Sequence, residues 1–277
     1  MGTTGCQLFG GILTTHIALA NSAQVLIRPD AAIQFGIDAT RAGILNIDPE
    51  LSAQVVPILR KLRTARPIDT VIDDLSGVGL APTAAWSLLE DLLAFGVVRE
   101  SPSAQVLLYG NGSLVDVTSF LLETSGFTPR PQIIDESARE FFALPSSHTL
   151  IINRLAHSQR LAPILKEMVP TYLSATIVDS RGIIGPGCRE GIGPCLMCVD
   201  LHHCDVDPHW LSLVHQQPNG PLFPDPVTEM ATAARLVAWV TADTWQPGTV
   251  EEVNPHDRTN SVRTLMVHPK CPICWEG

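Results

Sequence analysis

Two Cys-x-x-Cys pairs contain four of the seven cysteines in this chain, Cys195 with Cys198 and Cys271 with Cys274. Two residues between cysteines let both sulfurs of one turn reach the same metal ion, and the thiolate is the form that binds it. Two such turns complete a tetrahedral zinc site, with sulfur–zinc distances of about 2.3 Å. Such a site leaves no coordination position open, so we expect a structural zinc that does not activate water.

Two other states of these cysteines stay open at this point, namely two disulfides or a redox-active pair. The equal spacing of the two pairs and the turn-forming prolines beside them, Pro194 and Pro272, favour zinc. A metal bound there would join two segments that are distant in the sequence, so its binding would contribute directly to folding.

The other cysteines and histidines near the first pair have weaker chemical interpretations. Cys188 and Cys204 could act as thiol nucleophiles, yet most leftover cysteines are buried or inert. His202, His203 and His209 could suggest a second metal, but their spacing matches no common ligand set. We expect these histidines to serve in polar packing, and the roles of the two cysteines stay open.

A glycine turn follows an apolar strand in the second half of the chain. The strand Val106–Tyr109 runs into Gly110 and Gly112, and a helical apolar pattern comes next, which is the order of a nucleotide-binding βαβ unit. The next strand is expected at Gln132–Asp135, where Asp135 lies near the position of a ribose-binding carboxylate. Gly110, Gly112 and Asp135 are therefore the candidate nucleotide-binding residues.

The same segment departs from a working nucleotide site in three ways. Val115 stands at the third position of the glycine motif, where a small residue is needed for close helix–strand packing. No Lys or Arg follows the turn within the helix, and Asn153 ends the third strand where a carboxylate could hold magnesium. We expect a retained scaffold whose nucleotide site is vestigial.

The rest of this half predicts a sheet that is mostly parallel at first. A strand is expected at Thr149–Asn153, a helix at 161–168 and a hairpin at 175–184. Residues 216–226 are rich in proline and should form a loop. Residues 227–240 predict a helix with a mostly apolar face, which is a candidate homodimer or partner interface and includes Met230, Ala234, Val237 and Trp239.

The first half predicts three short strands followed by three helices and a strand, the order of a winged helix. Asp48 and Pro49 form a helix start, with Asp as the N-cap. The expected elements are strands at 25–28, 32–36, 43–47 and 97–98, and helices beginning at Pro49, after Pro67 and near Pro82.

Composition and charge limit what this chain can do. At 277 residues, with 45% hydrophobic and 17% charged residues, it is long enough for two globular domains. The net charge of −10, and a third helix with Glu90 and Asp91 but no basic residue, exclude nucleic acid as the expected partner and disfavour anionic membranes. A protein-binding or peptide-binding role is favoured for the winged helix.

Residues 1–21 are expected to form a loosely attached tail, followed by a peptide-binding domain at 22–101 and a second domain at 102–277. No Lys or Arg precedes Arg28, so the tail does not match a signal peptide, and no apolar run reaches the roughly 18 residues of a membrane span. Free thiols suit a reducing compartment, so a cytoplasmic protein is expected.

Four segments carry a resemblance to a known family. Residues 185–188, 194–202, 205–210 and 268–274 resemble blocks in ThiF-like proteins of azoline-forming cyclodehydratase systems. These systems make ribosomally synthesised, post-translationally modified peptides, bacteriocins among them. The resemblance implies a Rossmann-like domain of the ThiF type, related to ubiquitin-activating and other adenylating enzymes, with a structural zinc held by the two cysteine pairs.

The resemblance also implies a function. The cyclodehydratase branch carries an N-terminal winged helix that holds the leader of the precursor peptide, and a separate YcaO-type enzyme performs the ATP-dependent chemistry. We therefore expect an accessory subunit that is not itself an enzyme. The alternative is an ATP-dependent adenylyltransferase acting on a peptide or ubiquitin-like C-terminus, but Val115, Asn153 and residues 137–140 depart from the motifs of that branch.

The leader is expected to add as a strand to an exposed sheet edge, because unpaired N–H and C=O groups there can bond to an extended peptide. The neighbouring third helix would supply pockets for its side chains. The candidate peptide-binding residues are Ile44, Leu45, Asn46, Trp86 and Glu90.

Overall fold

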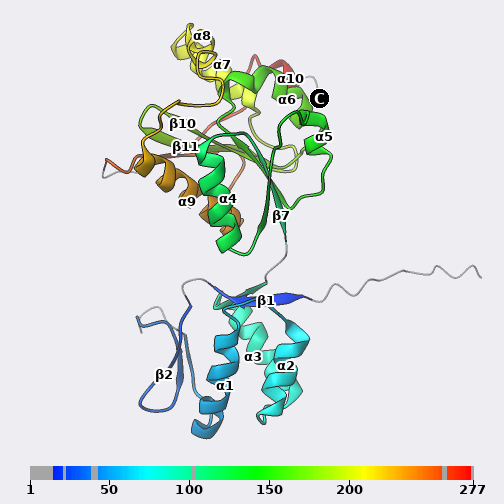
Figure 1. The fold of residues 1–277 in the computed structure, drawn as a ribbon, viewed down its shortest axis with the longest axis vertical. Coiled ribbons are helices and arrows are strands. Elements are labelled where there is room, and N and C mark those ends of the chain that lie inside the picture. The colour runs from blue at the N-terminus through cyan, green and yellow to red at the C-terminus, as the bar shows by residue number, and fades with distance from the viewer. Residues whose placement is uncertain (1–14, 21–22, 39–42, 101–103, 258–260, 276–277) are drawn as a thin grey trace, which may run out of the picture. The chain divides into compact units, whose positions relative to one another are not determined.

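The computed structural model describes residues 15–20, 23–38, 43–100, 104–257 and 261–275. The chain forms two compact units, which divide between Pro102 and Ser103 (Figure 1). Unit 1 precedes this boundary and unit 2 follows it. None of the helices in the described ranges is both long and apolar enough to cross a membrane.

The described residues of unit 1 form two small antiparallel sheets and three helices. The first sheet has the order β5-β1-β6 and the second the order β2-β3-β4. The strands are β1 (His16–Leu19), β2 (Val25–Ile27), β3 (Ile33–Phe35), β4 (Gly43–Leu45), β5 (Arg66–Pro67) and β6 (Val98–Glu100). The helices are α1 (Pro49–Lys61), α2 (Ile68–Gly77) and α3 (Pro82–Ala94).

Local sequence explains where these helices begin. The Asp48 side chain accepts a hydrogen bond from the backbone N–H of Glu50 at 2.9 Å, and Pro49 follows in the first turn, as expected for a capped helix start. Helix α3 likewise begins at a proline, Pro82. The three helices bury one shared core, in which Leu59, Leu75 and Leu89 are fully buried.

The C-terminal part of the segment expected to be a loosely attached tail, residues 1–21, contains a strand in the structure. His16–Leu19 forms strand β1, which pairs with both β5 and β6, and Ile17 is completely buried. Burial of Ile17 and Leu19 in the core of unit 1 stabilises this strand. Residues 1–14 and residue 21 of the expected tail lie outside the described residues.

Unit 2 is built on a seven-stranded mixed sheet with the order β13-β12-β11-β10-β9-β7-β8. Strands β8, β7, β9 and β10 are parallel, and β10 to β13 pair antiparallel, so the expected parallel start of the sheet is confirmed. The strands are β7 (Gln105–Tyr109), β8 (Thr128–Pro131), β9 (His148–Ile152), β10 (Tyr172–Val178), β11 (Arg181–Cys188), β12 (Thr249–Val253) and β13 (Ser261–Thr264).

Helices cover both faces of this sheet (Figure 1). Alternate residues of each strand face opposite sides, so Leu108 and Leu150 pack beneath α4 and α9 while Leu107 and Ile151 pack beneath α5, α6 and α7. The helices are α4 (Ser113–Thr124), α5 (Ala138–Phe142), α6 (Ser158–Met168), α7 (Leu196–Val206), α8 (Trp210–Val214), α9 (Pro226–Ala242) and α10 (Pro272–Trp275), with a 3-10 turn η1 (Leu155–His157) before α6.

One expectation for unit 2 is corrected, and the expected helix at 227–240 is confirmed as α9. The strand after α4 is Thr128–Pro131, not Gln132–Asp135, and its two prolines are tolerated because β8 is an edge strand of the sheet. Helix α9 packs its buried face, which includes Ala233, Leu236 and Val240, onto the sheet and α4. Of the expected apolar face, Val237 is buried in this core, whereas Ala234 and Met230 are exposed, Met230 to 62%.

Candidate functional site

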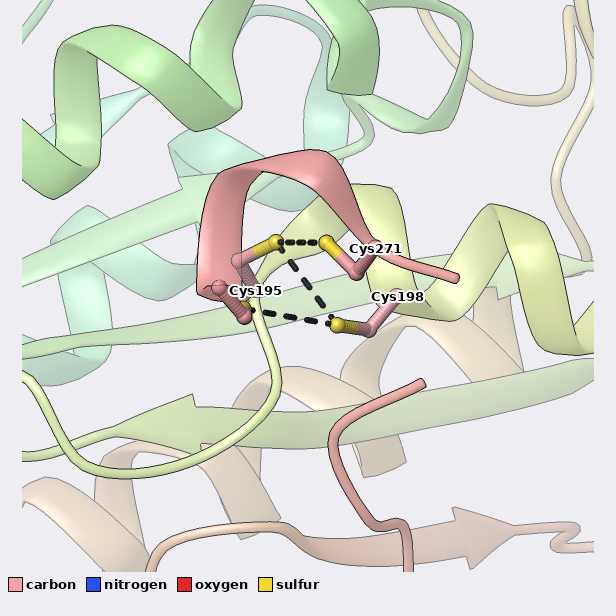
Figure 2. A group of neighbouring side chains, drawn as sticks. Cys195, Cys198 and Cys271 are labelled. Carbon is pink, nitrogen blue, oxygen red and sulfur yellow. Dashed lines mark hydrogen bonds between the residues drawn. The ribbon is translucent and has the colours of Figure 1, made fainter. Parts of the chain in front are cut away.

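The four cysteines of the two Cys-x-x-Cys pairs lie together in unit 2. Cys195 is the N-cap of α7 and Cys198 lies in its first turn, whereas Cys271 directly precedes α10 and Cys274 lies within it. Figure 2 shows the side chains of Cys195, Cys198 and Cys271 lying close together. The four sulfurs all lie within 4.8 Å of one another. The four cysteines could therefore hold one metal ion.

The sulfur spacing fits tetrahedral coordination. The Sγ atoms of Cys195 and Cys198 are 3.8 Å apart, those of Cys195 and Cys271 3.5 Å, and those of Cys198 and Cys274 3.6 Å. A tetrahedron with arms of about 2.3 Å has edges of about 3.8 Å. A disulfide would require a sulfur–sulfur distance of about 2.05 Å, and all four cysteines are free.

Electrostatics in this cluster favour a bound cation. The Cys198 sulfur accepts a hydrogen bond from the Cys195 thiol, which lowers the pKa of Cys198 to about 5, and the backbone N–H of His268 donates to the same sulfur at 3.4 Å. As the donor to that sulfur, Cys195 has a raised pKa, and burial raises the pKa of Cys274 to about 11. Four clustered thiols cannot all ionise without a counter-charge, and a divalent metal supplies it.

A buried hydroxyl beside the four cysteines gives a second indication that these residues suit a bound metal ion. The Tyr172 hydroxyl is buried and has no hydrogen-bond partner among the described residues. Burial raises the pKa of Tyr172 well above its usual value, and nearby thiols that include Cys188 and Cys195 raise this pKa further. The phenol therefore stays protonated, and a metal-bound thiolate would be a suitable acceptor for its O–H.

His268 lies against the cluster but points away from it. Its Nδ1 accepts a hydrogen bond from the backbone N–H of Lys270 at 3.1 Å, so Nε2 carries the proton that is donated to Asp205 at 2.9 Å. The indole N–H of Trp275 donates to the backbone carbonyl of His268 at 2.9 Å. His268 thus fastens the second cysteine pair to α7 and is not positioned as a ligand.

The remaining cysteines and histidines show no second metal-binding cluster within the described ranges. Burial raises the pKa of Cys188, which makes it a poor nucleophile, and Cys204 is half-buried. His202 contacts the carbonyl of Met266 at 2.9 Å. His203 stacks on Trp210 with ring centroids 4.0 Å apart.

The glycine turn is present, but it serves packing between strands. A Cβ atom on Gly110 would collide with the backbone carbonyl of Ile152 in the neighbouring strand β9. Gly112 caps α4 with φ at +91°, a conformation that favours glycine. Val115 is buried in the core beneath α4.

A carboxylate of this chain lies at the start of α4, where a nucleotide-binding helix would receive phosphate. The Ser113 hydroxyl donates to Glu229 of α9 at 2.5 Å, and Glu229 is only 7% exposed. A negative charge is stabilised at a helix N-terminus, and it would repel a phosphate there. No sequence signal at α4 indicated this group, because Glu229 comes from a distant helix.

The structure also places Asp135, the third candidate nucleotide-binding residue, and Asn153, which stands where a carboxylate could hold magnesium. Asp135 is exposed in the turn after β8, with φ at +66°. Asn153 is buried, and its side-chain oxygen accepts hydrogen bonds from the Ile177 backbone N–H at 3.0 Å and the Thr176 hydroxyl at 3.2 Å. Its acceptor oxygen is thus already used to join the ends of β9 and β10.

The candidate peptide-binding residues lie on the surface of unit 1. Strand β4 is at the edge of its sheet and pairs only with β3 among the described strands, and Ile44 is 45% exposed. Leu45 is half-buried against the same core as α3, and Asn46 is exposed after the strand. Trp86, which is 44% exposed, and Glu90 lie one turn apart on the outer side of α3.

The sequence did not point to a cavity of about 280 Å³ in unit 2. Its walls come from β9 to β13 on one side and from α7 and α8 on the other. These segments are far apart in the sequence, and the cysteine pair at the start of α7 marks the metal centre, not the cavity.

Comparison with known proteins gives a fold but no family. No family model matches the chain, and no curated protein matches it. Among solved structures, it is similar to a heterocyclase in complex with substrate and cofactor, at 16% identity and a TM-score of 0.55 over 94% of this chain. The heterocyclase TruD matches at 14% identity with a TM-score of 0.54 over the same share.

This chain spans 40% of the first heterocyclase and 43% of TruD. MccB, a microcin C7 biosynthetic enzyme solved in complex with N-formylated MccA, is less similar in structure. The match covers 94% of this chain and 99% of MccB, at 11% identity and a TM-score of 0.48. The two heterocyclases therefore share the fold of this chain over both of its units.

Proposed function

We propose that this protein binds the leader of a ribosomal precursor peptide and presents the peptide to a separate YcaO-type cyclodehydratase. The observation that carries the proposal is the shared fold with two heterocyclases over 94% of the chain. The chain corresponds to only about two fifths of those proteins. We assign the ATP-dependent chemistry to a partner protein, and recognition of the precursor to this chain.

Unit 1 is the part of the chain that would hold the leader. It offers an edge strand, β4, and an exposed tryptophan and carboxylate on α3, Trp86 and Glu90. Its two three-stranded sheets and three helices support the winged-helix interpretation, which stays a prediction. Contact with a YcaO-type partner and a homodimer contact also stay predictions.

In unit 2 we propose that the metal is zinc and that its role is structural. Four thiolate ligands at tetrahedral spacing match the preference of zinc, and all four ligand positions are taken by protein. The ion would hold the segment around Cys271 and Cys274 against α7. It would supply charge compensation to the thiolates and no reaction chemistry.

Reconstitution tests the proposed function. A candidate precursor peptide and a YcaO-type cyclodehydratase are mixed with and without this chain, and mass spectrometry follows the loss of one water per azoline formed. We expect modification at least about a hundredfold faster with the full chain, because holding a peptide next to the catalytic site raises its effective concentration. Equal rates with and without the chain would exclude the presenting role.

Nucleotide binding distinguishes the proposed function from the alternative, an adenylyltransferase, because adenylation requires bound ATP. We expect calorimetric titration of the full chain with Mg-ATP to give a dissociation constant weaker than about 1 mM. The physical reasons are the Glu229 carboxylate at the start of α4 and the use of Asn153 in joining two strands. Micromolar affinity, or pyrophosphate exchange in the presence of the precursor, would make adenylation the better assignment.

A further inference from the structure

The parallel part of the sheet in unit 2 has a topological switch point between β7 and β9. The strand that follows β7 in the chain, β8, lies on one side of it, whereas β9 and then β10 lie on the other side. Nucleotides of open α/β sheets bind outside the carboxyl ends of the strands at such a point. In this chain that position lies next to Tyr109, the glycine turn and Asn153, which follow one another around the ends of β7 and β9.

Arg154, the second residue after β9, crosses this switch point. Its guanidinium lies 5.4 Å from the ring centre of Tyr109, the last residue of β7, and donates to the side-chain oxygen of Gln132 after β8 at 3.4 Å. A shorter hydrogen bond runs from the same guanidinium to the side-chain oxygen of Asn219 at 2.6 Å. One side chain therefore connects the ends of three parallel strands with the loop between α8 and α9.

Residues 217–220 of that loop, here called the strap, lie against the end of β9. The backbone N–H of Gly220 donates to the carbonyl of Gln217 at 3.1 Å, which closes a tight turn. A Cβ atom on Gly220 would lie 2.6 Å from the Asn153 side chain, and φ at this glycine is +81°. Both the close approach and the backbone conformation therefore require glycine at this position.

The segment that follows the strap brings a carboxylate to the start of α4. Helices α4 and α9 lie side by side (Figure 1), and Glu229 in the first turn of α9 accepts the hydroxyl proton of Ser113 at 2.5 Å. Asp225 fixes this turn, because its side chain caps α9 by accepting the backbone N–H of Thr228 at 2.9 Å. Ser113 is the first residue of α4, where a nucleotide-binding helix presents its N–H groups to phosphate.

We propose that residues 217–229 of this chain take the position of a nucleotide in unit 2 and close it to ligands. Arg154 and Asn219 lie outside Tyr109, and the Glu229 carboxylate stands in for phosphate at the N-terminus of α4. The protein itself orders the ends of these strands, so unit 2 adopts the same state with or without ATP. This inference goes beyond leader binding, and an open nucleotide position would leave the proposed function intact.

Hydrogen exchange of the full chain tests whether the strap closes this position. Gly220→Ala should displace the strap, because the added methyl group meets Asn153, and Asn219→Ala removes an exposed side chain, so it keeps the fold while releasing Arg154. In both variants we expect the backbone amides of 217–220 and 153–157 to exchange at least about fivefold faster, as for a lost hydrogen bond to a charged group. Gly191→Ala is the matched control, because Gly191 has a similar φ of +77° and open space at its Cβ position. If either variant exchanges like the control, the strap does not close the position.

Binding of inorganic pyrophosphate tests the role of Glu229. Calorimetry compares Glu229→Gln with Glu123→Gln, each combined with Gly220→Ala, and Glu123 is the control because it is exposed at the far end of α4. We expect the Glu229 variant to bind pyrophosphate at least about tenfold more tightly, because a like charge no longer repels the anion at the N-terminus of α4. Melting curves establish that each variant is folded, and the exchange experiment decides alone if the Glu229 variant is not. Equal affinity of the two folded variants, including no detectable binding by either, would overturn the proposal.

Discussion

Cys198→Ser is expected to remove the metal from the protein and to lower its melting temperature by at least about 10 °C. Cys198 is fully buried, and its sulfur contacts Cys195 and Cys274 and accepts the backbone N–H of His268. Serine is a poor metal ligand, and three thiols would remain crowded around an incomplete site. Structural zinc contributes on the order of 10 kcal/mol or more to folding in small zinc domains, so its loss should destabilise the fold around α7 and α10.

The matched control for this variant is Cys204→Ser. Cys204 lies six residues further along the same helix, is half-buried and is not part of the four-sulfur cluster. Elemental analysis of untagged protein should find about one zinc per chain in the control and in the unmodified protein, and almost none in Cys198→Ser. Zinc-free unmodified protein, or a Cys198→Ser variant that keeps its metal and its melting temperature, would refute the assignment.

The metal site could be predicted because its information is local. Each Cys-x-x-Cys turn positions two sulfurs by itself, so only the meeting of two turns remained to be established, and the structure brings them within 4.8 Å. The start of α1 is local in the same way, since Asp48 and Pro49 act on the adjacent turn. The hydrogen-bonding roles of His268 could not be predicted, because the imidazole meets Asp205 from a distant segment.

Elements that depend on non-local pairing were predicted poorly. Strand β1 is short, and its partners β5 and β6 lie far along the chain, so no neighbouring sequence signal marks it. Pro129 and Pro131 argued against a strand at β8, and only its edge position in the folded sheet explains their tolerance. Glu229 meets Ser113 across 116 residues of sequence, and the contact of Arg154 with Asn219 arises in the same way.

Binding of the leader peptide by unit 1 should depend strongly on Trp86. We expect Trp86→Ala to weaken leader binding to the full chain at least about tenfold, because an exposed aromatic side chain is a frequent energetic anchor of an interface. Fluorescence anisotropy with a labelled synthetic leader measures the change. Phe95→Ala is the matched control, since Phe95 is an exposed aromatic residue at the C-cap of the same helix.

Charge on α3 gives the same binding event a second, kinetic readout. Glu90 is exposed one turn after Trp86 and has no basic neighbour on the helix, so it should attract a leader with Lys or Arg near its anchor. Glu90→Gln is expected to reduce the association rate at low ionic strength and to have little effect at about 1 M salt, where the screening length falls to about 3 Å. If Trp86→Ala and Phe95→Ala bind the leader equally, and Glu90→Gln associates like the unmodified protein at every salt concentration, the leader does not dock on α3.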